Sequence, residues 1–347
     1  METTFGAASS LARALLESAG MPSPPAARTA WALAVAEVWG RGSHGLLRLP
    51  FYLERFAAGG ANPAAGLREA SSTSVTAVYD GENGLGHWQL WSAAHRASAM
   101  AREQGIAAVA VGNSGHCGVL GLHVWPIVAS GLVGLVFSSG PAVIPPWGGH
   151  APVVSTSPLA AGIPTRPRPA IVDLAVSAVA RGRIAEHAQA GQELPEGWAF
   201  DATGAPTTDP HAALAGMLAP LGGAKGFALA FLVEALAGGL VGPSLATGVA
   251  DPLDPGSAAL PQRIGHLVLA LDPRRLDLDG GADDRLEALA ASVLAAGGRL
   301  PGGNHRPPAE IGDDEPLEVA DPVAARLAAL ARAQGVPLEG AWVRSGR

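Results

Sequence analysis

The segment from residue 75 to residue 138 constrains the fold most, because two kinds of pattern alternate along it. Short apolar runs with the length of strands are separated by longer amphipathic runs with the spacing of helices. A chain that alternates in this way predicts an α/β core, in which helices cover a sheet. The strands are expected at 75–80, 106–111 and 132–138, and the helices at 87–104 and 120–130, with a kink at Pro126.

Helices are also expected on both sides of this core. Ser23 is the expected N-cap of a second helix, Pro24 its first-turn proline, and Gly59-Gly60 the end of a third. A long apolar run that contains Glu234 and Gly238 is expected to be a buried helix. The helices are placed at 5–20, 23–40, 46–58, 225–240, 283–296 and 323–334, the strands at 171–174 and 265–271, and irregular, Pro- and Gly-rich stretches at 141–169 and 191–224.

Composition excludes several classes of protein. The 347 residues are 48% hydrophobic, yet Gly, Pro or charge interrupts every apolar run of spanning length, and no secretory signal opens the chain, so no membrane partner is expected. A net charge of −7 without a basic stripe argues against nucleic acid. The single cysteine fits a reducing compartment and favours the cytoplasm. The histidines lack metal-ligand spacing and GxSxG is absent, so neither a metal nor a serine hydrolase is expected.

The string Ser43-His44-Gly45-Leu46-Leu47-Arg48 is the first candidate for chemistry. Histidine is suited to proton transfer near neutral pH, and an arginine four residues later shares its face if the segment is helical. His44 would then donate a proton and Arg48 would hold a carboxylate through a bidentate pair. In the alternative, His44 caps a helix and Arg48 pairs with an acid such as Glu54.

The string GNSGHCG, residues 112–118, follows a predicted strand and precedes a predicted helix. Its glycines allow a close backbone approach, and free N–H groups at a helix start attract phosphate. It lacks GxGxxG and GxxxxGK[ST], so a Rossmann fold is not predicted. His116 is either a second acid/base or nicotinamide contact, or a loop histidine. Cys117 is either a nucleophile or a buried apolar residue.

Two further residues are candidates for ligand contacts. Lys225 is the only lysine and lies between glycines at a predicted helix start, where anions bind, although a solvated lysine is the alternative. Asp173 ends a predicted strand and would bind a ribose hydroxyl, orient a histidine, or act as a cap.

Together these strings resemble the malate/L-lactate dehydrogenase family that is distinct from the Rossmann-type enzymes. That family also includes ureidoglycolate, sulfolactate and 2,3-diketogulonate dehydrogenases and a branch that reduces imines. The matching pieces run in family order from about residue 40 to residue 303. They include SHGLLRLP, GNSGHCGVLG, PPWGG, STSPLAAGIP, IVDLAVSAVARGRI, LPEGWAFDATGAPTTDP, PLGGAKGFALAFLVEALAG and RLPGG.

The resemblance implies hydride transfer between NAD or NADP and a small 2-oxo or 2-hydroxy acid. His44 matches the proton donor, Ser43 the residue that orients it, and Arg48 the carboxylate ligand, while Gly140 matches a substrate contact and His116 the base of one branch. The implied cofactor contacts are His116, Cys117, Gly118, Val119, Leu120, Asp173, Leu174, Ala175, Lys225, Gly226, Pro301, Gly302 and Gly303.

The resemblance also implies a fold of the α/β (α+β) class and a homodimer with sites near the subunit interface. A helical N-terminal unit is expected at 1–72, a core α/β substrate and dimer domain at 73–120 with 250–347, and a non-Rossmann NAD(P)-binding domain at 121–249.

Several departures from the family pattern leave the substrate open. Cys117 stands where a bulky residue is common, Ser139 and Ser157 replace asparagines, His150 replaces a basic residue, and Ala224 is small. Reduction of a cyclic imine, such as a piperideine- or pyrroline-2-carboxylate, is therefore an alternative. A catalytically inactive nucleotide-binding paralogue is a second one.

Overall fold

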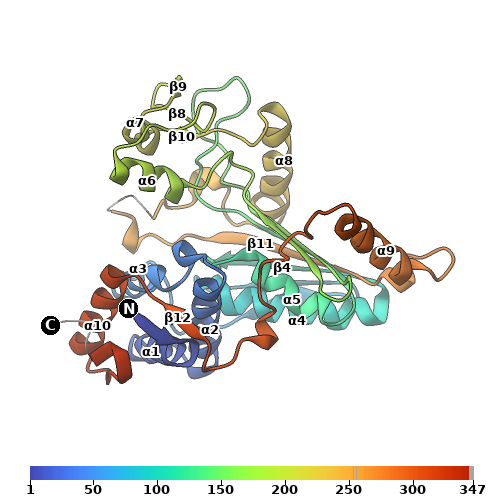
Figure 1. Cartoon of the computed structure of the whole chain (residues 1–347), viewed down its shortest axis with the longest axis horizontal. Coiled ribbons are helices and arrows are strands. Elements are labelled where there is room, and N and C mark those ends of the chain that lie inside the picture. Colours follow the sequence, from blue (N-terminus) through green and yellow to red (C-terminus); the bar gives the residue numbers. More distant parts are fainter. Residues whose placement is uncertain (253, 255, 344–347) are drawn as a thin grey trace.

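A seven-stranded sheet is the centre of the molecule in the computed structural model, which describes residues 1–252, 254 and 256–343. Its order is β2-β3-β4-β11-β5-β6-β7, and neighbouring strands are antiparallel except for the parallel pair β3 and β4. This mixed α/β arrangement confirms the predicted class (Figure 1). The strands are β2 (Arg68–Ser72), β3 (Thr76–Asp80), β4 (Ile106–Ser114), β5 (Val133–Ser138), β6 (Leu159–Ile163), β7 (Ala170–Leu174) and β11 (Ile264–Leu271).

The two faces of this sheet carry different cores. On one face, α4 (Gly86–Gln104) and α5 (Trp125–Val128) pack against buried residues that include Val109 and Val268. On the other, a smaller cluster joins Leu267 of β11 to Val233 of α8 (Ala224–Glu234). Because successive side chains of a strand point to opposite faces, Leu267 and Val268 serve the two cores separately.

The chain ends return to one helical unit beside the sheet. Helices α1 (Phe5–Ser18), α2 (Ser23–Val38) and α3 (Leu49–Ala58) share a core with α10 (Asp321–Ala333). Strands β1 (Glu2–Thr4) and β12 (Pro316–Glu318) pair antiparallel at its edge. The C-terminal helix thereby completes the unit that the N-terminal helices begin (Figure 1).

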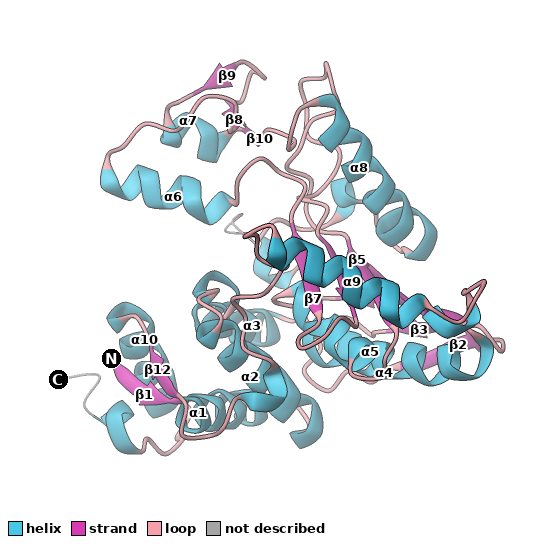
Figure 2. Ribbon diagram, turned by 45° about the vertical axis from the view of Figure 1, so that its right-hand side comes forward, coloured by secondary structure: helices cyan, strands magenta, loops and turns pink. Residues whose placement is uncertain are grey.

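A separate group of short elements lies across the sheet from α4 and α5 (Figures 1 and 2). It has its own core, which includes Ile144, Val176, Ile184 and Ala230. Its elements are α6 (Arg181–Ala190), α7 (Pro210–Ala215), α8, and a small antiparallel sheet of β8 (Ala199–Phe200), β9 (Pro206–Thr207) and β10 (Met217–Leu218). Helix α9 (Ala282–Ala295) is joined to the segment between β6 and β7 by the ion pair of Glu287 with Arg166.

Several predicted boundaries are wrong, each for a local reason. The helix predicted at 120–130 is a 3-10 helix (Leu120–Val124) followed by α5, in which Pro126 occupies the first turn and makes no kink. Ser23 is the first residue of α2, and Pro22 stands at the N-cap. The stretch 141–169 contains β6, which its prolines and glycines concealed.

The helix predicted to be buried at 225–240 is exposed along much of its length. It continues from α8 into a π-helix (Ala235–Val241), and Phe231 and Leu240 are 63% and 70% exposed. By length and composition alone, Ala224–Val241 could cross a membrane, but its buried side packs on the sheet and includes the hydrogen-bonded Glu234. The apolar sequence reflects one face on the core and one face turned outward.

Candidate active site

The first motif forms two consecutive 3-10 turns rather than the start of a helix. They cover Gly42–His44 and Leu46–Arg48, and the backbone of Gly45 breaks them apart. The spacing predicted that His44 and Arg48 share one face of an α-helix, and this prediction is wrong because the break at Gly45 separates them. Arg48 is nevertheless held next to the first turn, because its Nε donates to the Ser43 carbonyl at 2.8 Å.

Glu37 of α2 fixes the break between these turns. Its Oε1 accepts the Leu46 N–H at 2.7 Å, and a Cβ on Gly45 would lie 2.8 Å from the Glu37 Cδ. Only glycine leaves room for the carboxylate there. Ser43 Oγ lies 3.0 Å from His44 Nδ1, so Ser43 is placed to fix the imidazole, as the resemblance implies.

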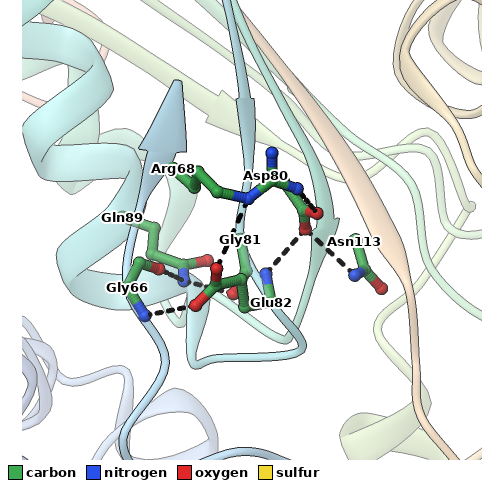
Figure 3. Close-up of polar contacts among 7 residues, drawn as sticks. All are labelled: Gly66, Arg68, Asp80, Gly81, Glu82, Gln89 and Asn113. Atoms are coloured by element: carbon green, nitrogen blue, oxygen red, sulfur yellow. Dashed lines mark hydrogen bonds and ion pairs between the residues drawn. The ribbon is translucent and has the colours of Figure 1, made fainter. Parts of the chain in front are cut away.

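The second motif begins inside β4, and a polar network anchors that part of it (Figure 3). Asp80 accepts hydrogen bonds from the Glu82 N–H and from Asn113 Nδ2, at 2.9 and 3.0 Å. Gln89 donates to the Gly81 carbonyl at 2.7 Å and accepts from Ser114 Oγ at 2.6 Å. Residues 112–114 are therefore bound to the turn after β3, and only the part from Gly115 onward faces the first motif.

His116 is the meeting point of the two motifs. Its ring centre lies 5.7 Å from that of His44, with nearly parallel planes. Its Nδ1 lies 2.6 Å from the hydroxyl of Tyr52 and accepts the Gly118 N–H at 3.3 Å. A backbone N–H can only donate, so Nδ1 must be unprotonated and the Tyr52 hydroxyl donates to it. The neutral imidazole of His116 then carries its proton on Nε2.

Burial and positive charge keep the histidines of this cluster neutral. Burial, then the charges of Arg48 and Arg41, lower the pKa of His44 from 6.5 to about 4. Burial, followed by Arg48 and the neighbouring histidines, lowers the pKa of His116 well below its ordinary value. An anionic ligand on Arg48 would remove one of these causes and raise both pKa values.

Tyr52, His87 and His266 belong to this cluster, and none was singled out in the sequence. Tyr52 is 1% exposed, and its ring lies 5.3 Å from that of His87. His266 donates from Nε2 to the Gly115 carbonyl at 3.2 Å, and its Nδ1 lies 2.9 Å from Ser138 Oγ. Of these three residues, only Tyr52 could have been predicted from the sequence, because it lies four residues after Arg48 in a segment expected to be helical.

The residues predicted to contact substrate and cofactor fall in different places. Gly140 is buried next to Ser139, whose Oγ donates to Glu234 at 3.0 Å. Lys225 is exposed in the first turn of α8, and the loop before that helix pairs with residues 176–178. A Cβ on Gly226 would collide with the Leu221 carbonyl, so that glycine permits a close approach of the backbone.

Cys117, Val119 and Leu120 are buried, and their side chains belong to the hydrophobic cores. Any cofactor contact by these three residues would use the backbone. Burial raises the pKa of the Cys117 thiol to about 12, so the nucleophile interpretation has no thiolate to support it. Gly118 has a positive φ of 73°, and a Cβ there would lie 2.8 Å from His87 Nε2.

Asp173 and Gly302–Gly303 are far apart in sequence but line one cavity of about 330 Å³. Ile171 N donates to the Pro301 carbonyl at 2.9 Å, and a Cβ on Gly302 would lie 2.7 Å from the Ile171 carbonyl. Leu174 and Ala175 continue from Asp173 at the end of β7. The lining residues are Arg41, Ile171, Asp173, Arg299, Leu300, Gly302, Gly303, Asn304 and His305.

A larger cavity of about 1070 Å³, between α1, α2 and the C-terminal segment, is lined by none of the predicted site residues. Within residues 1–252, 254 and 256–343, no group of three or more His, Cys, Asp or Glu side chains could hold a metal ion. The chemistry therefore concentrates around His44 and His116, with the 330 Å³ cavity as a second locus.

Comparison with known proteins agrees with the resemblance. The profile of the malate/L-lactate dehydrogenase family matches residues 4–318. The chain is 42% identical over 297 residues to (2R)-3-sulfolactate dehydrogenase (NADP(+)) from Chromohalobacter salexigens, covering 85% of this chain and 88% of that protein. It is 36% identical over 295 residues to Delta(1)-pyrroline-2-carboxylate reductase from Ancylobacter novellus, covering 84% and 86%.

Among solved structures, sulfolactate dehydrogenase from Methanocaldococcus jannaschii superposes with a TM-score of 0.89 at 26% identity, covering 97% of this chain and 98% of that one. Sequence and fold therefore point to the same group of enzymes. The chain is an NAD(P)-dependent oxidoreductase that belongs to the malate/L-lactate dehydrogenase family.

Proposed function

We propose that this enzyme transfers a hydride between nicotinamide C4 and C2 of a small 2-oxo or 2-hydroxy acid. The observation that carries the proposal is the placement of His44 and Arg48 on adjoining 3-10 turns opposite His116. One guanidinium for the substrate carboxylate and two imidazoles for its 2-oxygen lie within one half-buried cluster. Relatives that act on sulfolactate support an anionic 2-hydroxy acid as substrate.

Arg48 binds the carboxylate in this mechanism and orients the reacting carbon. The guanidinium is fixed through Nε by the Ser43 carbonyl, which leaves its terminal nitrogens for a bidentate pair. The bound carboxylate offsets the Arg48 charge, so the His44 pKa rises from about 4 toward neutrality. Substrate binding thereby helps His44 to hold the proton that it donates to the developing alkoxide.

His116 acts as a hydrogen-bond donor to the same oxygen in the reducing direction. Its Nδ1 accepts from Tyr52 and Gly118, so Nε2–H is the group left for the substrate. A base role for His116 in the oxidising direction would require the proton to leave Nε2 or the tautomer to change. Ser43 orients His44 through the 3.0 Å contact.

The chain offers a fitting site for the nicotinamide cofactor. His305 Nδ1 is a buried nitrogen without a partner among the described residues, and it lies in the cavity that Asp173 and Gly302–Gly303 also line. The backbone after Gly118 supplies a second cradle, because a side chain there would strike His87. Pro301, Lys225, Gly226 and the 173–175 segment complete the proposed set. When bound, the cofactor supplies the hydride.

We place this cofactor region, without a Rossmann fold, at 121–249, a range whose β5, β6 and β7 also complete the central sheet. The core substrate and dimer domain is placed at 73–120 and 250–315, because β12 and α10 pack with the N-terminal helical unit. The 330 Å³ cavity draws residues from both segments and from the helical unit at 1–72. A homodimer is part of the proposal. Exposed apolar residues along α8 and the π-helix, among them Leu229, Phe231, Leu232 and Leu240, favour burial against a second subunit. The single cysteine favours the cytoplasm.

Reduction of a cyclic imine is the second candidate. The specific observation in its favour is the low pKa of His44, since a C=N substrate that is already protonated needs less help from an acid. The pyrroline-2-carboxylate reductases at 36–40% identity support it. An inactive nucleotide-binding paralogue is less consistent with a site that keeps Ser43, His44 and Arg48 in contact.

Loss of NADH and NADPH absorbance against a panel of substrates tests these alternatives. The panel contains pyruvate, oxaloacetate, 3-sulfopyruvate and the two cyclic imines, without added metal. Turnover of a 2-oxo acid supports the main proposal, and turnover of imines alone favours the alternative. Cofactor binding without turnover of any compound would favour the inactive paralogue.

A further inference from the structure

The 330 Å³ cavity is positively charged at its rim, in a protein whose net charge is −7. Arg41 and Arg299 are both exposed there, and His305 lies between Trp39 and the cavity, stacked on that indole at 4.8 Å. The one acidic lining residue is Asp173. Three cationic or proton-binding side chains from two segments thus share the cavity with one carboxylate.

The two arginines differ from their neighbours in having no carboxylate partner. Arg306 pairs with Glu315, and Arg168 pairs with Glu310 at 3.3 Å. Within the described part of the chain, neither Arg41 nor Arg299 forms an ion pair. Guanidinium groups left free around a cavity are suited to a bidentate anion such as a phosphate.

Asp173 does not oppose an anion at this rim. Its side chain is turned toward Gly121, where a Cβ would lie 3.0 Å from Asp173 Oδ2. Burial raises the pKa of this carboxyl, against the opposing effects of the Gly121 N–H and the Arg41 charge. A half-buried carboxyl in the same cavity as two exposed guanidiniums is placed to accept a ribose hydroxyl.

Arg41 links the cavity to the catalytic motif. Arg41 precedes Ser43 by two residues, and its positive charge lowers the pKa of both His44 and His305. The diphosphate common to NADH and NADPH already has candidate ligands elsewhere, in the backbone N–H groups after Gly118 and at the glycine-flanked start of α8. A separate arginine pair is then available for an additional phosphate.

We propose that Arg41 and Arg299 bind the 2′-phosphate of NADP(H) and make the enzyme selective for NADP(H) over NAD(H). This inference rests on the proposed function in so far as a nicotinamide dinucleotide is the cofactor. It adds the choice between the two cofactors, which the sequence leaves open. His305 Nδ1 gives the bound phosphoribose a further hydrogen-bonding group.

The test is direct binding to the full-length protein without substrate. Isothermal titration compares NADPH with NADH, and adenosine 2′,5′-bisphosphate with ADP, for the wild type and for Arg41→Ala and Arg299→Ala. Arg332→Ala, an exposed arginine of α10, is the matched control. Each cavity variant should weaken NADPH and adenosine 2′,5′-bisphosphate about tenfold and change NADH and ADP less than twofold.

Two results would overturn the proposal. Equal weakening of NADPH and NADH would mean that the arginines hold the shared diphosphate, and unchanged NADPH binding in both variants would mean that they hold no phosphate. Arg299→Lys, which keeps the charge without the fork, should fall between wild type and Arg299→Ala, and it guards against a folding defect. Selective NADPH binding without turnover of any substrate would support this inference and contradict the proposed reaction. Turnover with equal use of NADH and NADPH would support the reaction and contradict this inference.

Discussion

The Tyr52 hydroxyl lies 2.6 Å from Nδ1 of His116 and donates to it, because the Gly118 N–H already requires Nδ1 to be an acceptor. This contact joins the helical unit to the second motif. It also decides which nitrogen of His116 faces the site with a proton. The sequence pattern of either motif alone holds no trace of this relationship, since 64 residues separate the two side chains.

Tyr52→Phe should lower kcat by about tenfold and change KM much less, because it removes one hydrogen bond from a residue that binds no substrate. It should also change the acid limb of the pH–rate profile, since His116 loses a donor that holds its neutral form. The pH dependence of kcat and kcat/KM checks this. A uniform loss at every pH, with the profile unchanged, would mean that Tyr52 only supports packing.

Arg48→Lys should raise KM for a 2-oxo acid by about tenfold or more, because an ammonium cannot reproduce the bidentate guanidinium pair. KM for the cofactor should stay close to that of the wild type. Steady-state kinetics with each substrate varied in turn provides the measurement. An unchanged KM for the 2-oxo acid would remove Arg48 from the carboxylate site.

His44→Ala should reduce kcat by about a hundredfold or more, as expected for loss of a general acid. In the wild type, occupation of Arg48 by the pyruvate analogue oxamate should raise the pKa of His44 from about 4. Titration of the His44 resonances by NMR, with and without oxamate, tests the second part. If His44→Ala kept a near-normal kcat, His116 would become the better candidate for the proton donor.

Stability should fall as the pH drops from 6.5 toward 4, because the buried histidines stay neutral in the fold and bind protons when unfolded. Burial lowers the pKa of His87 and His266 to about 3 and that of His123 to about 4. The unfolded chain binds more protons in this window, so each such histidine contributes up to about 1.4 kcal/mol of lost stability per pH unit. The raised pKa of Glu234 acts in the opposite direction and offsets part of this slope.

His87→Leu provides the check on that slope. Both ring nitrogens of His87 are buried without a partner among the described residues, so this change removes a titrating group without breaking a hydrogen bond that the structure contains. Denaturant unfolding at several pH values should give a shallower slope for the variant by up to about 1.4 kcal/mol per pH unit. Parallel curves for the two proteins would show that His87 is not a buried neutral histidine.

Cys117→Ala should leave kcat and KM within about twofold of the wild type, because the buried, protonated thiol has no nucleophilic role. Iodoacetamide should likewise leave the native enzyme active. Rapid loss of activity on alkylation, or a large drop in kcat for the variant, would restore Cys117 as a participant in the reaction.

Periodicity predicted the central sheet well where strands are short and apolar. The expected strands at 106–111, 132–138, 171–174 and 265–271 lie within or largely overlap β4, β5, β7 and β11. Periodicity gave the wrong start for the helix expected at 46–58. The break at Gly45, which packs against Glu37, places a 3-10 turn at Leu46–Arg48 and moves the start of α3 to Leu49. Such a break depends on a residue of α2 and cannot be predicted from local spacing.

The candidate site was predictable only in part, for a related reason. His44, Arg48 and His116 are marked by motifs, whereas His266 reaches the second motif only because β11 pairs with β4 across the sheet. Arg41 and Arg299 become neighbours of one cavity only through the return of the chain after α9. Long-range pairing of this kind leaves no periodic signal in the sequence.

The most direct test of the central claim is a single-turnover reaction with NADPH deuterated at the transferable position of nicotinamide C4. With the 2-oxo acid that the panel identifies, the product 2-hydroxy acid should carry the deuterium at C2, and the same experiment with Arg48→Lys should give far less product at low substrate concentration. Mass spectrometry of the product measures both. Oxidation of NADPH without deuterium at C2 of the product would contradict hydride transfer to a 2-oxo acid.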